Sequence, residues 1–157
     1  RIHYASAMTM LKKESSDDAS YLDIAEFIMT RGATRSIKND LAQLFRRVVF
    51  NAAISNRDDH LRNHGFILMP NGWRLSPAFD INPNIDKAEH ALNLDIGDNR
   101  ANLESVIATA QYYELTQDQA VQIASEILSV TRTWEAVAKN LAISRGDIEL
   151  MRAAFQS

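Results

Sequence analysis

The sequence predicts a mainly α fold, a helical bundle with one inserted β-hairpin, and three observations support this. Apolar residues recur mostly at intervals of three and four, which is the spacing of an amphipathic helix. The 157 residues include only 5 Gly and 3 Pro, so turn-forming residues are few. One short stretch, residues 66–75, has instead the apolar run and the Asn-Gly turn of paired strands. The length suits a single domain over residues 1–157.

Composition limits the classes of protein to which the chain can belong. With 46% hydrophobic and 24% charged residues, it is typical of globular proteins and not of disordered ones. The chain has no cysteine, which excludes a disulfide framework and a Cys nucleophile and fits a cytoplasmic location. The formal net charge of −3 argues against direct nucleic-acid binding. No apolar run approaches the roughly 18 residues of a membrane span, so we expect no membrane contact.

Two long helices are predicted in the first third of the chain. Ser20 with Asp23 forms a capping box, which predicts a helix over Tyr21–Arg31 that ends at Gly32. A second helix is predicted over about 36–55, because apolar residues form one stripe along it: Ile37, Leu41, Leu44, Phe45, Val48, Val49 and Ala52. Its second half is strongly apolar, so we expect it to be the most buried helix of the fold.

The hairpin and the last helices follow. Residues 66–69 and 73–75 read as two strands joined by a turn at Pro70-Asn71-Gly72, after which two prolines favour an extended, irregular path. Thr116 and Gln119 form another capping box, which predicts one helix as far as Leu141. Ser144 with Asp147 predicts a final helix.

Polar side chains crowd both ends of the predicted hairpin. Residues 56–65 contain two Asp, two His, two Arg and two Asn, and Asp80 follows the second strand. A hairpin brings its two ends together, so we expect Asn63 and Asp80 to be neighbours although 17 positions separate them. Asp and Asn oxygens are hard ligands that suit Mg²⁺. Together with Asp58, which could accept a proton from a hydroxyl, they are the groups that phosphoryl transfer requires.

At this point the residues resemble a known family. Arg57-Asp58 followed by Asn63 is similar to the protein-kinase catalytic loop, and Asp80 occupies the place of the metal-binding Asp. More closely, residues 55–66 (SNRDDHLRNHGF) and 73–83 (WRLSPAFDINP) resemble the C-terminal domain of HipA-family serine/threonine kinases, which are toxins of toxin–antitoxin pairs. The resemblance implies a protein-kinase-like C-terminal lobe.

The resemblance also implies roles for individual residues. Asp58 matches the catalytic Asp that positions the substrate hydroxyl and takes its proton, while Asn63 and Asp80 match the two Mg²⁺ ligands. His60, Asp59 and Arg57 are expected to support the loop. The implied cofactors are ATP and Mg²⁺. The implied partners are a protein substrate phosphorylated on serine, which is an aminoacyl-tRNA synthetase in the best-known case, and a DNA-binding antitoxin.

The sequence departs from a complete kinase in one respect. Its five glycines are isolated, so no Gly-rich loop is present to cradle ATP phosphates. We therefore expect the N-terminal, ATP-cradling lobe to lie outside this chain, and the chain alone to transfer little or no phosphate.

Several alternatives stay open from the sequence. Asp59 reads as a loop brace or a surface charge, with a substrate contact as a third reading, and Arg57 could bind phosphate or pair with Asp59. His60 and His64 are the residues that a zinc site would use, but further ligands nearby are lacking. At the level of function, the alternatives are a non-catalytic module that docks an antitoxin or a separate N-terminal lobe, and a metal-dependent phosphohydrolase or small-molecule kinase.

Overall fold

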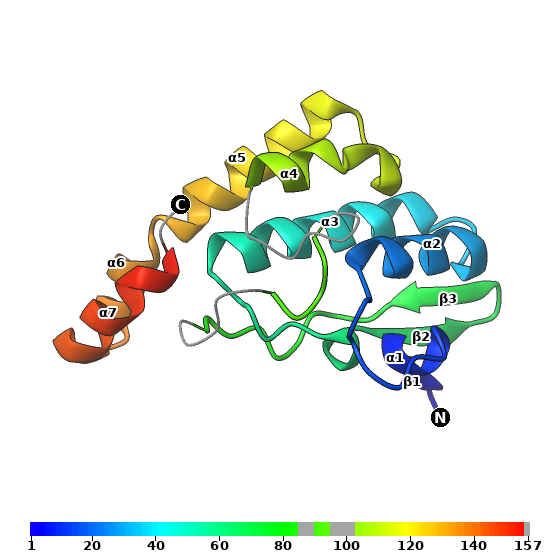
Figure 1. Ribbon diagram of the computed structural model, residues 1–157, viewed down its shortest axis with the longest axis horizontal. Coiled ribbons are helices and arrows are strands. Elements are labelled where there is room, and N and C mark those ends of the chain that lie inside the picture. Colours follow the sequence, from blue (N-terminus) through cyan, green and yellow to red (C-terminus); the bar gives the residue numbers. More distant parts are fainter. Residues whose placement is uncertain (85–89, 95–102, 156–157) are drawn as a thin grey trace.

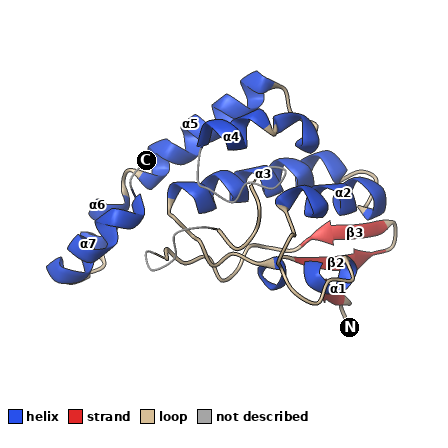
Figure 2. Ribbon diagram, in the orientation of Figure 1, coloured by secondary structure: helices blue, strands red, loops and turns tan. Residues whose placement is uncertain are grey.

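The structure of the chain, a computed structural model, describes residues 1–84, 90–94 and 103–155. Within them the elements follow in the order β1 (Tyr4–Ser6), α1 (Ala7–Met10), α2 (Tyr21–Arg31), α3 (Ile37–Ala53), η1 (Leu61–Asn63), β2 (Gly65–Met69), β3 (Gly72–Leu75), α4 (Leu103–Ala108), η2 (Ala110–Tyr113), α5 (Gln117–Thr131), α6 (Trp134–Asn140), α7 (Arg145–Met151) and η3 (Arg152–Phe155). The fold is mainly helical with one small sheet, as predicted (Figure 2).

The central helix α3 organises the molecule. It lies between the sheet on one side and α4 and α5 on the other, with α2 beside it (Figure 1). The sequence prediction that its second half is deeply buried is confirmed, since Val48 and Val49 are fully buried and Ala53 is 5% exposed. Apolar side chains of α2 and α5 complete the core, among them Ile24, Ala25, Ile28, Ala120 and Ala124.

Helix α2 has the predicted bounds and the predicted cap. The Ser20 hydroxyl accepts from the N–H of Asp23 at 3.2 Å, and the Asp23 carboxylate accepts from the N–H of Ser20 at 2.8 Å. Because this reciprocal pair satisfies two backbone donors that the helix leaves open, it fixes Tyr21 as the first helical residue. The Tyr21 side chain is thereby held at a defined place, where it is fully buried.

Helix α3 ends in a Schellman motif. The N–H of Asn56 donates to the carbonyl of Asn51 at 2.8 Å, and the N–H of Ser55 donates to the carbonyl of Ala52 at 3.3 Å. Ser55 adopts the left-handed conformation, with φ of 52°, at a position that glycine usually fills. This sharp reversal sends residues 56–64 back along the end of α3 and toward β2.

The sheet has three antiparallel strands in the order β1-β2-β3. The hairpin prediction is confirmed, but β1 was not predicted, because three residues are too few to show a period of two. The turn is one residue shorter than predicted, because Gly72 belongs to β3. Met69 pairs with Gly72, so Pro70 and Asn71 form the loop. Gly72 alone of the turn has a positive φ, 133°, and a Cβ there would lie 2.7 Å from the carbonyl oxygen of Gly32.

The C-terminal part differs from the sequence prediction. The single helix expected from Thr116 to Leu141 is broken into α5 and α6, because the chain turns between Thr131 and Trp134. The second helix, α6, leads into α7 and η3, and these three form an arm that extends from the body (Figure 1). The N-cap predicted at Ser144 is present, and its hydroxyl accepts from the N–H of Asp147 at 3.1 Å.

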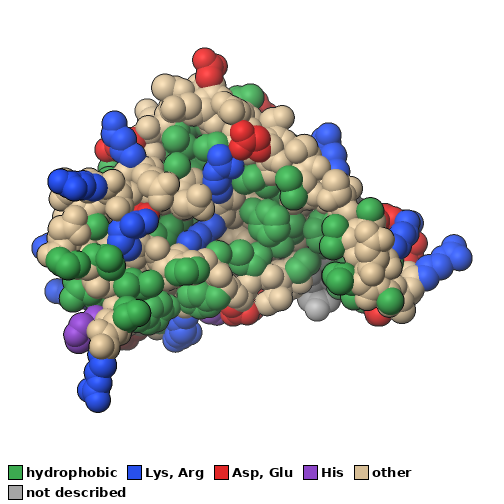
Figure 3. Space-filling view, turned by 180° about the vertical axis from the view of Figure 1, so that it is seen from behind, with side chains coloured by type: hydrophobic (Ala, Val, Ile, Leu, Met, Phe, Trp, Pro, Cys, Tyr) green, Lys and Arg blue, Asp and Glu red, His purple; other side chains and the backbone are tan. Residues whose placement is uncertain are grey.

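Aromatic packing holds the two ends of the arm together. Trp134 of α6 and Phe155 of η3 stack with their ring centroids 4.4 Å apart and an interplanar angle of 10°. An apolar groove of about 380 Å³ lies where the arm meets the body (Figure 3), and its lining includes Phe50, Val130, Trp134, Val137, Leu141 and Phe155. The groove is thus lined by residues of the body, such as Phe50 of α3, and by residues of the arm.

A candidate active site at the base of the hairpin

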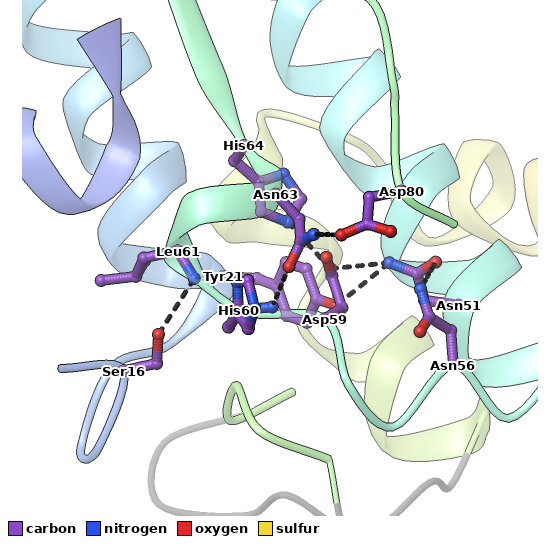
Figure 4. Close-up of polar contacts among 10 residues, drawn as sticks. All are labelled: Ser16, Tyr21, Asn51, Asn56, Asp59, His60, Leu61, Asn63, His64 and Asp80. Carbon is purple, nitrogen blue, oxygen red and sulfur yellow. Dashed lines mark hydrogen bonds and ion pairs between the residues drawn. The ribbon is translucent and has the colours of Figure 1, made fainter. Parts of the chain in front are cut away.

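Two segments that lie apart in the sequence meet at the base of the hairpin (Figure 4). Asn63 ends the loop before β2, and Asp80 lies in the irregular segment after β3. The Nδ2 of Asn63 donates to Oδ2 of Asp80 at 2.5 Å. The prediction that these two residues are neighbours is confirmed.

The Asn63 side chain is held at both of its polar atoms. Besides the bond to Asp80, its Oδ1 accepts from the backbone N–H of His60 at 2.9 Å. The backbone N–H of Asn63 in turn donates to the carbonyl of His60 at 2.8 Å, which closes the 3₁₀ turn η1. Asn63 is 5% exposed, so this amide is a fixed and largely enclosed group. An sp² oxygen has a second lone pair, so Oδ1 can still serve as a ligand.

Asp80 is exposed and has an unusual backbone conformation. Its φ is 55°, in the left-handed region, which Asp tolerates better than most non-glycine residues. Its Oδ2 faces Asn63, and its Oδ1 accepts from Nδ2 of Asn82 at 3.0 Å. The two amide donors orient the carboxylate without neutralising its charge.

The donor set at this place fits Mg²⁺. Asn63 and Asp80 provide hard oxygens, and Mg²⁺ is commonly held by one or two protein groups together with phosphate oxygens and water. Among the described residues, no group of three or more His, Cys, Asp or Glu side chains is arranged to hold a metal ion. A site with one carboxylate and one amide is thus more suitable for Mg²⁺ shared with a phosphate than for an ion enclosed by protein.

The neighbouring carboxylates Asp58 and Asp59 lie in opposite environments. Asp58 is exposed, so a substrate hydroxyl could reach it. Asp59 is only 3% exposed, which rules out the surface-charge reading of that residue. The sequence could not distinguish these two adjacent, identical side chains, and the fold does so by burying the second.

Asp59 is the centre of a buried hydrogen-bond network (Figure 4). Its Oδ2 accepts from the Tyr21 hydroxyl at 2.5 Å and from Nδ2 of Asn51 at 2.7 Å, and lies 2.8 Å from Nε2 of His64. Asn51 is itself positioned by Asn56, whose Nδ2 donates to Oδ1 of Asn51 at 3.1 Å. We call Tyr21, Asn51, Asn56, Asp59 and His64 the Asp59 network. Its members come from α2, α3, the loop and the residue before β2.

The charge states in this network follow from its contacts. Burial alone would raise the pKa of the Asp59 carboxyl, but the adjacent His64 and the hydrogen bond from Tyr21 hold that pKa below its usual range. Asp59 is therefore an ionised acceptor, and Nε2 of His64 carries a proton and donates to it. Burial, and then the negative charge of Asp59, raise the pKa of the Tyr21 hydroxyl well above its ordinary value, so this group stays a donor.

The other predicted loop residues have more limited roles in the geometry. His60 is partly buried and contributes its backbone to Asn63, while its Nδ1 is enclosed and makes no hydrogen bond within the described part of the chain. Arg57 is partly buried. His64 is committed to Asp59, so the zinc reading based on His60 and His64 has lost one of its ligands.

Sequence reasoning missed Tyr21 and Asn51 as members of the site, and it placed Asn56 in the polar stretch 56–65 without giving it a role. Tyr21 lies 38 positions from Asp59, and no local pattern connects them. One signal was available for Asn51, since it is the polar residue within the apolar second half of α3. A polar side chain in a helix that is otherwise buried needs a partner, and here the partner is the loop that carries the carboxylates.

Comparisons with known proteins agree with the fold described above. The sequence profile of the HipA-like C-terminal domain matches residues 1–134. A search of curated proteins returned no match. Among solved structures, a similar chain belongs to the complex of the Shewanella oneidensis MR-1 toxin–antitoxin system HipA, HipB and its operator DNA, with a TM-score of 0.74 and 15% sequence identity.

That structural match extends over nearly all of this chain. It covers 96% of this chain but 41% of the Shewanella chain, so the present chain spans about two fifths of the length of that protein. The likeness confirms the predicted fold, a kinase-like C-terminal lobe. No helix among the described residues is long and apolar enough to cross a membrane. With the family profile covering most of its length, the chain belongs to the HipA-like C-terminal domain family.

Proposed function

We propose that the chain is the C-terminal catalytic lobe of a HipA-like serine/threonine kinase, which transfers the γ-phosphate of ATP to a serine of a protein substrate. Asp58 orients the serine hydroxyl and accepts its proton. Asn63 and Asp80 hold Mg²⁺ against the phosphates of ATP. The observation that carries the proposal is the 2.5 Å contact that joins Asn63 to Asp80 beside the loop of Asp58.

The chemistry of the proposed reaction needs few protein groups. When bound, Mg²⁺ would neutralise the charge that develops on the transferred phosphate. What the protein adds is position: one exposed carboxylate for the hydroxyl, and fixed oxygens for the ion. Asp58 is exposed while Asn63 is enclosed and bonded at both polar atoms, and this contrast supports giving the proton-accepting role to Asp58.

The proposal includes further parts outside this chain. ATP binding also requires a phosphate-cradling loop, which the isolated glycines of this sequence do not supply. We propose that a separate N-terminal lobe provides it, and that the chain alone is inactive or nearly so. We further propose a DNA-binding antitoxin as a partner and, by family resemblance, an aminoacyl-tRNA synthetase as a substrate. The similar Shewanella chain was solved with HipB and operator DNA.

The test compares phosphate transfer by the longest native polypeptide that contains these residues with transfer by its Asp58→Asn variant. Transfer of label from γ-labelled ATP to serine is measured in the presence of Mg²⁺, with total cell protein as the acceptor. Loss of a general base typically lowers the rate by about 10²–10⁴-fold. Because Asp58 is exposed, the unfolding midpoint should not change. The matched control is Asp118→Asn, which neutralises an exposed carboxylate of α5.

Transfer at the parental rate by the Asp58→Asn variant would overturn the proposal. The second candidate function, antitoxin docking without catalysis, is supported by the HipB-containing complex of the similar chain. It predicts that the unchanged protein transfers no phosphate. It also predicts that the triple variant Asp58→Ala, Asn63→Ala, Asp80→Ala binds the antitoxin as tightly as the unchanged protein does.

A further inference from the structure

The Asp59 network contains more hydrogen bonds than a carboxylate needs for burial. Three donors from three different parts of the chain converge on one oxygen, Oδ2 of Asp59: the hydroxyl of Tyr21, the amide of Asn51 and the imidazole of His64. Their distances are 2.5, 2.7 and 2.8 Å. Convergence of this kind fixes the oxygen in all three directions, because moving it toward one donor stretches the bonds to the others.

Burial makes these bonds strong. Tyr21 is fully buried, Asn51 is 1% exposed and His64 is 2% exposed. With water excluded, an ionised carboxylate that loses a donor has no replacement, so each bond is costly to break. The Tyr21 and His64 rings also contact each other edge to face, with centroids 5.6 Å apart, which keeps both donors in place.

The network acts on the segment that carries the proposed chemistry. Asp59 is bonded directly to Asp58 in the chain and is followed by His60, whose backbone N–H holds Oδ1 of Asn63. The next N–H, that of Leu61, donates to the hydroxyl of Ser16 at 3.0 Å. Asp58 itself lies on the surface. The anchored side chain of Asp59, the following residue, is a fixed point close to its backbone.

We propose that Tyr21 and Asp59 are positioning residues of the phosphoryl-transfer site: the Tyr21 hydroxyl holds Asp59, and Asp59 in turn sets the place of Asp58 and Asn63. This inference rests on the proposed function and adds to it a residue of α2 that touches neither substrate nor metal. It also gives a reason for Asp at position 59, where an ionised carboxylate accepts from all three donors at once. Reacting groups displaced by about 1 Å can lose on the order of a hundredfold in rate, so such an anchor controls activity through geometry.

The experiment uses Tyr21→Phe, Asp59→Asn and the double variant. Tyr21→Phe removes one hydroxyl and leaves the buried ring, while Asp59→Asn keeps the side-chain shape and removes the charge. The matched control is Asp40→Asn, which changes another buried carboxylate, 3% exposed, that is bonded to Arg74 and to the N–H of Leu75 away from the loop. Unfolding midpoints are measured for all four variants, so that every assay is made where the protein is folded.

Three readouts separate positioning from plain stability. The first is native-state hydrogen exchange at the N–H groups of His60 and Leu61, which we expect to accelerate by about ten- to a hundredfold in Tyr21→Phe and Asp59→Asn but not in Asp40→Asn. The second is Mn²⁺ affinity, measured by electron paramagnetic resonance with Mn²⁺ alone, which should fall in the same two variants. The third is kcat of the native polypeptide at saturating ATP and Mg²⁺, which should fall about tenfold in the same two variants. The double variant should lose less than the sum of the two single losses, because both changes weaken the same hydrogen bond.

The outcomes also separate this inference from the proposed function. If Asp58→Asn abolishes transfer but exchange, Mn²⁺ affinity and kcat of Tyr21→Phe match those of the parent, the positioning role is wrong and the proposed function stands. If Asp40→Asn changes the three readouts as much as Asp59→Asn does, the effect is general destabilisation and the inference is likewise overturned. Parental transfer by Asp58→Asn removes the proposed function itself.

Discussion

Asn63 and Asp80 lie 17 positions apart, yet the Nδ2 of the first is 2.5 Å from the Oδ2 of the second. The hairpin between them makes this possible, because its two ends return to the same side of the sheet. The contact joins the loop before β2 to the irregular segment after β3, and it points both side chains at one place. A cation bound there would depend on both segments at once.

The first prediction concerns the metal ligand Asp80. Asp80→Asn keeps a side chain that tolerates the left-handed backbone but removes the negative charge, so Mn²⁺ affinity should fall by about tenfold or more. Titration of the 157-residue chain with Mn²⁺, followed by electron paramagnetic resonance, measures this. Asp118→Asn serves as the control for loss of one negative charge. Equal affinities of parent and Asp80→Asn would show that the ion binds elsewhere.

The second prediction concerns the end of α3. Ser55 occupies the left-handed position of a Schellman motif, with φ of 52°. Glycine has no steric cost there, and this gain exceeds the extra freedom that glycine has in the unfolded chain. We expect Ser55→Gly to raise the free energy of unfolding by about 0.5–1 kcal/mol. Urea denaturation checks this, and Ser55→Val, which is β-branched, should change stability in the opposite direction.

The sequence predicted those elements whose signals are local. The capping boxes at Ser20 and Thr116 gave the starts of α2 and α5, because a cap is made by residues three apart. The strand β1 was missed, because what stabilises it is distant. Its Tyr4 ring lies over Gly65, where an added Cβ would be 2.2 Å from the ring. No pattern in the sequence near Tyr4 predicts this contact.

The candidate site was predictable to a similar degree. The spacing of the motif placed Asn63 and Asp80 together, since a short hairpin has few possible geometries. The different burial of Asp58 and Asp59 was not predictable, because it depends on Tyr21 and Asn51, which reach the loop from two helices. Contacts of this kind arise only when the helices have packed.

The third prediction concerns how the stability of the fold depends on pH. His90 is 4% exposed, and burial, opposed by the backbone of Asn56 and reinforced by the charge of Arg57, lowers its pKa. A His whose pKa is lower in the folded state binds its proton more readily when unfolded. Stability should therefore be complete above the unfolded pKa of about 6.5 and decrease as the pH falls below it.

Thermal unfolding of the parent and of His90→Gln between pH 7.5 and 5 measures this contribution. The variant cannot take up the proton, so its midpoint should depend less on pH over this range. Asp59 contributes in a separate range. Its pKa is lowered in the folded state, so the stability it provides is present above about pH 4 and is lost as the pH falls through the folded value. Identical pH profiles of the parent and His90→Gln would contradict the contribution of His90.

The fourth prediction concerns the arm. Trp134 stacks on Phe155, and such a pair typically contributes about 0.5–1.5 kcal/mol beyond its buried area. Phe155→Ala should therefore loosen α6, α7 and η3, which would shift Trp134 fluorescence to longer wavelength and speed hydrogen exchange in residues 134–155. Exchange at His60 and Leu61 should stay as in the parent. Phe155→Tyr should retain the stacking and the emission wavelength, and unchanged or slower exchange in the arm of Phe155→Ala would contradict this account.

The left-handed backbone of Asp80 restricts which mutations this position can accept during evolution. A β-branched residue there is opposed by the backbone, and glycine suits the backbone but provides no oxygen. Asparagine tolerates the left-handed backbone and keeps one side-chain oxygen, but it lacks the negative charge. Most substitutions of Asp80 therefore strain the backbone or remove the proposed ligand oxygen, so the conformation and the proposed metal site depend on the same side chain.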